Sequence, residues 1–240
     1  MENDNTADDR QLAIGTPVAL ADLQQDQGLG LTDLGNDDQA TPFLKILQAI
    51  SREVSRKSDA YIQGAEPGMI ADSVERVAFD GDEGIDVVCV RVEPAWIEWE
   101  QDDRGGQGTF VARHPADLDV SHLGKNDRGE VITQTGNVLV KTLYFYVLRV
   151  LEDGGVAPAV ISMARSQLKK GRAWNRQMLS ATVENEGQRF RAPSFYYKYR
   201  LRTTSESGRG GEYYAWSVER GGAVDAALYQ VAKSAYETMV

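Results

Sequence analysis

The sequence predicts a mainly β protein of the α+β class: a small antiparallel barrel or strongly curved sheet with an inserted helix and a C-terminal helix. Three observations lead to this prediction. Short apolar or alternating runs, typical of strands, recur between residues 85 and 219 and are separated by Gly- and Asp-rich turns. A segment of helical composition interrupts them, and another closes the chain. Many short strands around one helix are typical of a barrel or curled sheet.

The composition limits the class of protein. The chain has 240 residues and a net charge of −10, which suits one domain plus a tail and excludes a generally basic nucleic-acid coat protein. Cys89, the only cysteine, lies in an apolar run and is expected to be a buried strand residue, so we expect a cytoplasmic protein. No apolar run has the ~20 residues of a membrane span, and the polar N-terminus does not resemble a signal peptide.

Residues 1–40 differ from the rest of the chain. They hold nine acidic residues against one base, Arg10, and are rich in Gln and Gly. This composition is typical of a mostly disordered acidic tail. Residues 41–240 are close to neutral and are expected to form a single domain.

The elements of that domain can be placed from local patterns. Thr41 and Pro42 are typical of a helix start, so the pattern predicts a short helix over 41–51. Residues 114–136 are polar and rich in Gly, Asp and Asn, which predicts a long loop. The predicted strands are 85–92, 95–100, 109–113, 138–151, 156–164, 194–203 and 212–219. The remaining helices are predicted over 166–182, although Gly171 weakens that one, and over 223–239.

One segment is positively charged, although the protein as a whole is negatively charged. Residues 163–202 contain ten bases, two acids and six aromatic residues. Single-stranded nucleic acid is bound by this combination, since bases stack on rings at about 1–3 kcal/mol each while Lys and Arg neutralise phosphates. The candidate phosphate-binding residues are Lys169, Lys170, Arg172, Arg176, Lys198, Arg200 and Arg202. The candidate stacking residues are Trp174 and Tyr196.

Periodicity predicts that these bases share a surface. At 100° per residue, Lys169, Arg172 and Arg176 fall on one side of the helix, and Leu168, Met178 and Leu179 lie on an adjoining stripe that can pack on the sheet. In the strand 194–203, alternation places Tyr196, Lys198, Arg200 and Arg202 on one face and Phe195, Tyr197, Tyr199 and Leu201 on the other. Ordinary solvated and core faces produce the same patterns, and Trp96, Trp99 and Trp216 are alternative stacking residues.

Three blocks of sequence resemble single-stranded DNA-binding proteins of tailed bacteriophages. They are PFLKILQAIS with YIQGAEPGMI, PAVISMARSQLKKGRAWNRQM, and FYYKYRLRT with GGEYYAWSVE. The resemblance runs over most of 41–220 and implies an OB-like barrel with an inserted helix. It implies coating of single-stranded DNA in phage replication or recombination, in the cytoplasm of the infected host, with replication or recombination proteins as partners. Many such proteins end in an acidic tail, whereas this chain carries its acidic segment at the other end, and we hypothesise that the segment screens the basic face.

The function expected is therefore a non-enzymatic, sequence-tolerant single-stranded DNA-binding protein without a cofactor; a strand-annealing protein is a near variant. A phage interaction or assembly protein, whose basic face docks an acidic protein partner, is the alternative. A third is a hydrolase using the carboxylates at 80–86, for which no spacing argument exists. The motif Ser166 to Lys169 is set aside because its companion motifs are absent, and a zinc site at His114 and His122 is set aside because surface histidines are far commoner than zinc ligands. The closing helix packs within the monomer or forms a homodimer contact.

Overall fold

The computed structural model describes residues 40–101, 108–127, 129–208 and 211–239. The chain divides into the units Met1–Ala40 and Thr41–Val240. The predicted acidic tail, residues 1–40, lies outside the described residues except for Ala40. The elements described are those of the second unit.

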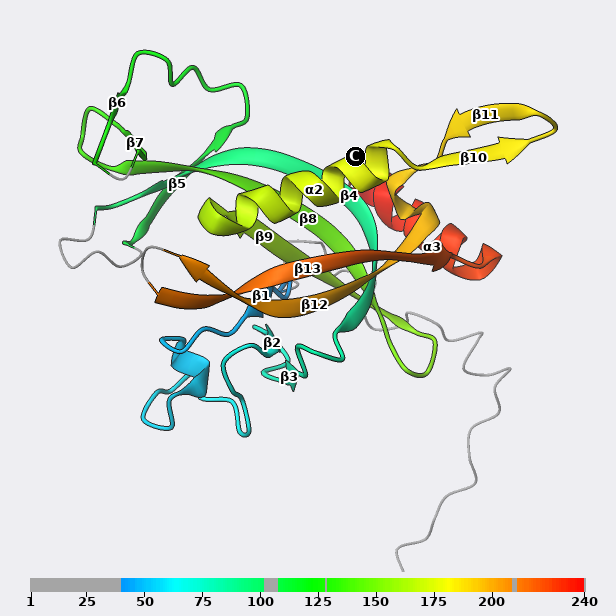
Figure 1. The fold of residues 1–240 in the computed structure, drawn as a ribbon, viewed down its shortest axis with the longest axis horizontal. Helices are drawn as coiled ribbons and strands as arrows, with labels where there is room; N and C mark the ends of the chain where they lie inside the picture. The colour runs from blue at the N-terminus through cyan, green and yellow to red at the C-terminus, as the bar shows by residue number, and fades with distance from the viewer. Residues whose placement is uncertain (1–39, 102–107, 128, 209–210, 240) are drawn as a thin grey trace, which may run out of the picture. The chain divides into compact units, whose positions relative to one another are not determined.

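A curled antiparallel sheet forms the body of this unit (Figure 1). Its strands run in the order β13-β12-β4-β8-β7-β6, and β5 and β9 pair with β4 and β8, respectively. Their bounds are β4 Ile85–Trp99, β5 Phe110–Pro115, β6 Gly124–Lys125, β7 Val131–Ile132, β8 Val138–Val150, β9 Val156–Ala164, β12 Tyr197–Gly208 and β13 Gly211–Ala223. The mainly β prediction is therefore confirmed as a curled half-barrel, and most predicted strands are present.

β4 joins two predicted strands, 85–92 and 95–100, into one. Its register against β8 shifts between Cys89 and Arg91, a bulge that sharpens the curl of the sheet. Pro94 lies between the part of β4 that pairs with β12 and the part that pairs with β5. Since this edge of β4 has no strand partner there among the described residues, a residue without an N–H is tolerated inside the strand.

The inserted helix, α2 (Leu168–Leu179), covers the main core. It follows a 3-10 turn, η3 (Arg165–Gln167), and presents Gly171, Trp174 and Met178 to the interior. A Cβ at Gly171 would lie 3.0 Å from Leu143 Cδ1. The glycine that weakens the helix locally therefore lets α2 approach β8 closely.

The segment 41–51 is not a helix, so that prediction is wrong. It forms β1 (Leu44–Ile46), which pairs with β2 (Ile70–Asp72), and β2 pairs with β3 (Ala78–Phe79). The 3-10 helix η2 (Arg52–Val54) follows. The Val160 N–H donates to the Pro42 carbonyl (2.8 Å), and Leu47 N–H donates to Met69 (2.8 Å), so tertiary hydrogen bonds replace the helical ones.

The 3-10 turn η4 (Ser194–Tyr196) precedes β12. Before it lies a hairpin of β10 (Thr182–Asn185) and β11 (Gln188–Arg191), which the sequence reading missed. At the chain's end α3 (Ala226–Thr238) confirms the predicted closing helix, capped by the Asp225 carboxylate, which accepts from Leu228 N–H at 2.8 Å. α3 packs on the outer side of β4 through a cluster that includes Val88 and Ala232.

Glutamine side chains close the free edge of β13. The Gln48 amide donates to the Tyr214 carbonyl (2.9 Å) and accepts from the Tyr214 N–H (2.9 Å). Gln167, in η3, donates to the same carbonyl (3.0 Å) and accepts from the Trp216 N–H (3.0 Å). Gln177 of α2 donates to the Val218 carbonyl (3.2 Å). The side of the barrel between β9 and β13 is thus closed by side chains instead of a strand ladder.

Candidate nucleic-acid interface

Three of the predicted phosphate-binding residues share the exposed face of α2. Lys169, Arg172 and Arg176 are exposed, at spacings of three and four residues, while Trp174 and Met178 are buried on the opposite side. The predicted face of the helix is therefore confirmed as geometry. We call these three cations the α2 row.

Trp174, predicted to stack on bases, is a core residue, and that prediction is wrong for this structure. Its side chain is fully buried and its ring stacks on Phe145, with centroids 4.3 Å apart, while the edge of Tyr199 lies at 5.5 Å. A tryptophan at the centre of an amphipathic helix serves the apolar face that binds the sheet. Leu179, expected to pack on the sheet, is instead 60 % exposed.

The predicted cations of β12 face outward but are mostly paired. Tyr199 and Leu201 are buried in the core, as the alternation predicts. The Arg200 guanidinium contacts the Asp86 carboxylate of β4 at 2.8 Å, and Arg202 contacts Glu219 of β13 at 3.1 Å. This row is therefore close to neutral in charge.

The remaining predicted residues also differ in their surroundings. Lys170 points away from the α2 row and pairs with Glu206 of β12. Tyr196 lies in η4, so it does not share the β12 face, and its ring meets Tyr197 edge-on at 4.8 Å. Among the described residues, no acidic side chain forms an ion pair with the α2 row or Lys198, although Lys169 lies near enough to Glu206 to contribute to the lowered pKa of that carboxylate.

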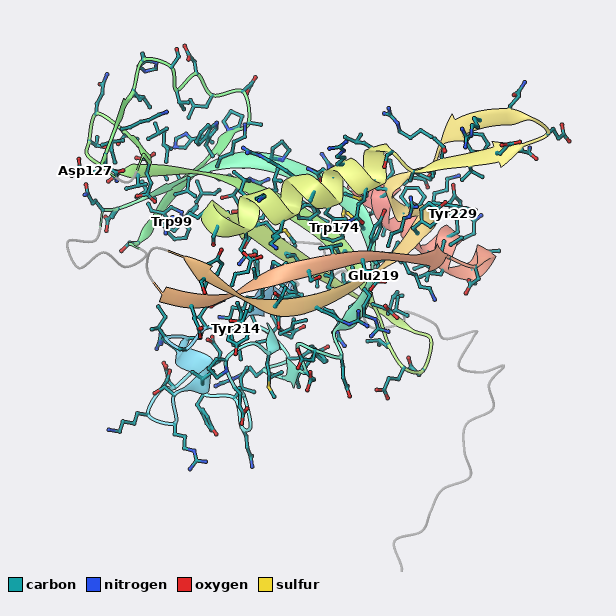
Figure 2. The ribbon with its side chains drawn as sticks, in the orientation of Figure 1. Trp99, Asp127, Trp174, Tyr214, Glu219 and Tyr229 are labelled. Atoms are coloured by element: carbon teal, nitrogen blue, oxygen red, sulfur yellow. The ribbon has the colours of Figure 1, made fainter. Side chains whose placement is uncertain are left out.

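A cleft that the sequence reading did not identify opens where the sheet meets the tip of the β12–β13 hairpin. Its volume is about 680 Å³. Residues of β4, β8, β9, η3 and β13 line it, among them Trp99, Tyr144, Ser162 and Tyr213. Ile50, 93 % exposed, stands on its rim. Figure 2 shows Trp99 near the β4–β5 end of the sheet, away from Trp174 under α2.

Aromatic rings of the cleft are held by specific contacts. Trp99 meets Phe110 of β5 edge-on at 5.9 Å, and Phe110 is 54 % exposed, so its ring is available to a ligand. The Tyr213 hydroxyl donates to Glu206 at 2.9 Å, and this hydrogen bond raises the pKa of Tyr213. The hydrogen bond from Lys170 lowers the pKa of Glu206, which keeps the carboxylate charged.

Glu93 fixes a cation beside the cleft. Its carboxylate accepts from Arg113 at 2.6 Å and from the Tyr146 hydroxyl at 3.1 Å, and Arg113 lies 4.9 Å from the ring centroid of Tyr144. Burial opposes ionisation, but the hydrogen bonds from Arg113 and Tyr146 outweigh it and lower the pKa of Glu93. One face of Tyr144 is thus occupied by Arg113.

The substitution Glu93→Gln is expected to destabilise the fold by about 1–3 kcal/mol at neutral pH, because the charge-assisted hydrogen bonds to Arg113 and Tyr146 are lost. The pKa of Glu93 in the folded protein lies below its usual value of 4.5, so this stability is present above pH 4.5 and lost as the pH falls through the lowered pKa. Urea unfolding of both proteins from pH 7 downward measures the difference. A difference that stays constant into strong acid would contradict this role of the carboxylate.

Other chemical centres find no support among the described residues. No group of three or more His, Cys, Asp or Glu side chains is placed to hold a metal there. Asp80 accepts backbone N–H groups of its own turn, and Asp86 pairs with Arg200, so both acids have structural partners. Cys89 is fully buried, and burial raises the pKa of its thiol.

The cleft could not be read from the sequence because its lining comes from distant segments. The local signal for the cleft is the alternation of Trp96 and Trp99 with polar residues, and it does not reveal which segments pack beside these rings. In the structure η3 joins the two features: Arg165 and Gln167 line the cleft, and the α2 row begins two residues later.

Comparisons with known proteins give one match. A family model described as Pam3 phage gp34-like protein matches residues 8–240. No curated protein and no solved structure matches this chain.

Proposed function

The chain belongs to the Pam3 phage gp34-like protein family, and we propose that this phage-family protein binds single-stranded DNA. It coats and protects single-stranded DNA in phage replication or recombination and has no enzymatic activity. It works in the cytoplasm of the infected host, with replication or recombination proteins as partners. In the described part of the chain, no helix is long and apolar enough to pass through a membrane.

The strand order supports an OB-like assignment. The strands β9, β8, β4, β12 and β13 follow one another across the sheet, and α2 lies in sequence between β9 and β12. OB-folds are five-stranded Greek-key barrels that bind oligonucleotides on the face of their second and third strands and in two flanking loops. If β4 is the first strand, β8 and β9 are the second and third, and the cleft lies on them.

The observation that carries the proposal is that η3 lines the cleft and the α2 row begins two residues after it. The cleft offers Trp99 and Tyr213, on which bases can stack, and the exposed ring of Phe110 lies beside it against Trp99. The α2 row offers three exposed cations to the phosphates of the same strand. A duplex keeps its bases stacked inside, so this arrangement suits a single strand.

Fluorescence titration with labelled oligo-dT and with duplex DNA tests the proposal. We expect strong preference for the single strand, and Phe110→Ala is expected to weaken binding by about 1–3 kcal/mol through loss of one stacking ring. Tyr236→Ala is the matched control, since Tyr236 is an aromatic residue 41 % exposed on α3. Absence of binding at low salt, or equal affinity for the duplex, would contradict the proposal. Either result would favour the alternative function, in which the basic face docks an acidic protein.

A further inference from the structure

The β10–β11 hairpin continues the chain directly from α2 and projects beyond the end of that helix (Figure 1). Its base is held by the Ala192 N–H, which donates to the Ala181 carbonyl at 3.0 Å. Apart from the half-buried Val183, every residue of its two strands is exposed. A two-stranded hairpin with so little cover is marginal on its own, and its exposed side chains are free to contact a ligand.

The turn gives the hairpin a defined register. Glu186 and Gly187 both have positive φ, 49° and 76°, as a type I′ turn requires. Asn185 pairs with Gln188, and Val183 pairs with Phe190. Because side chains alternate along a strand, Arg189 and Arg191 lie on one face and Phe190 lies on the other.

The exposed side chains of the hairpin repeat the chemistry of the α2 row. Phe190 is 49 % exposed. Arg189 approaches Glu184 only at 3.9 Å, with both side chains mostly in solvent, a contact worth little. Arg191 is exposed, and the ion pairs of the described residues do not include it. Together with the α2 row, Arg189 and Arg191 therefore make five exposed cations between the start of α2 and the end of β11.

We propose that the β10–β11 hairpin is the far end of the path that a single strand follows from the cleft along the α2 row. The strand crosses the exposed hairpin, with phosphates on the face of Arg189 and Arg191 and a base stacked on Phe190 at the opposite face. The inference rests on the proposed function. The twelve residues of α2 span about 18 Å, so a strand that leaves the cleft passes the α2 row before it reaches the hairpin. A protein partner is disfavoured as occupant because Phe190 and Val183 form too small an apolar patch for a stable interface.

Oligo-dT of two lengths tests the hairpin: about 5 nucleotides, which fits the cleft alone, and about 20, which exceeds the usual site of an OB-fold. Phe190→Ala is expected to raise the Kd for the long oligonucleotide about fivefold or more and to leave the short one unchanged. Arg189→Gln with Arg191→Gln should reduce the salt slope for the long oligonucleotide by about 1.4. Gln188→Ala, which removes neither charge nor ring, is the control, and circular dichroism checks folding.

The outcomes separate this inference from the function it rests on. If the unmodified protein binds neither oligonucleotide, the proposed function itself has failed. If it binds both and the hairpin variants bind the long one equally well, the hairpin is not part of the path and the inference is overturned. A change of molar mass in the hairpin variants, with DNA binding intact, would also overturn it and would assign the hairpin to contacts between copies of the chain.

Discussion

Replacing Lys169, Arg172 and Arg176 together by alanine is expected to flatten the dependence of log K on log salt by about two units. Each phosphate neutralised on a single strand contributes about 0.7 to that slope, and the α2 row supplies three exposed cations that form no ion pair among the described residues. The loss of affinity should be largest at low salt. Titrations of oligo-dT over a series of salt concentrations measure both quantities.

A charge-matched control makes this result specific. Arg56, Lys57 and Lys233 are exposed bases on other parts of the molecule, and their triple alanine variant changes the net charge equally. It should leave the slope nearly unchanged. Equal flattening in both triple variants would mean that the net charge matters and the α2 row does not. Arg200→Ala with Arg202→Ala should have a smaller effect than the α2 variant, because both arginines already face acidic partners.

Trp174→Ala is expected to destabilise the protein by about 3–5 kcal/mol, the usual cost of deleting a buried ring. The indole fills the space between α2, Phe145 and Tyr199, and its removal leaves a cavity that α2 cannot close without shifting on the sheet. Burial of Tyr199 in the same core raises the pKa of its hydroxyl to about 12. Urea unfolding followed by circular dichroism measures the loss.

Trp174→Phe separates the core role from the base-stacking role. Among the described residues the buried indole N–H has no hydrogen-bond partner, so a phenyl ring removes an unsatisfied donor and keeps the contact with Phe145. Stability should fall much less than in Trp174→Ala, and affinity for single-stranded DNA should not change. Weaker DNA binding with unchanged stability would return Trp174 to the binding surface.

Local patterns predicted the sheet well where burial on one or both faces controls the sequence. The strand 156–164 matches β9 at both ends, and the apolar run 138–151 is β8 to within one residue. The helix predicted over 41–51 does not form, because the helix-start residues Thr41 and Pro42 are weak local signals. Hydrogen bonds to β2 and β9, contributed by residues far along the chain, decide its conformation.

The candidate site was predictable only in its helical part. The spacing of Lys169, Arg172 and Arg176 fixes their common face without any knowledge of the sheet. The β12 cations could not be judged in the same way, because Asp86 and Glu219 reach them from β4 and β13. A count of charges along the chain cannot detect partners that only strand pairing brings close. The cleft depends on the same long-range pairing.

The glutamines along β13 have a consequence for how copies of this protein crowd together. A bare strand edge is a template on which a second chain can add its own strand, and proteins that gather at high local concentration are the most exposed to this growth. Gln48, Gln167 and Gln177 already occupy the carbonyl and N–H groups that such a neighbour would need at Tyr214, Trp216 and Val218. If the protein coats single-stranded DNA as proposed, neighbouring copies on one strand can therefore touch without their sheets joining through this edge of β13.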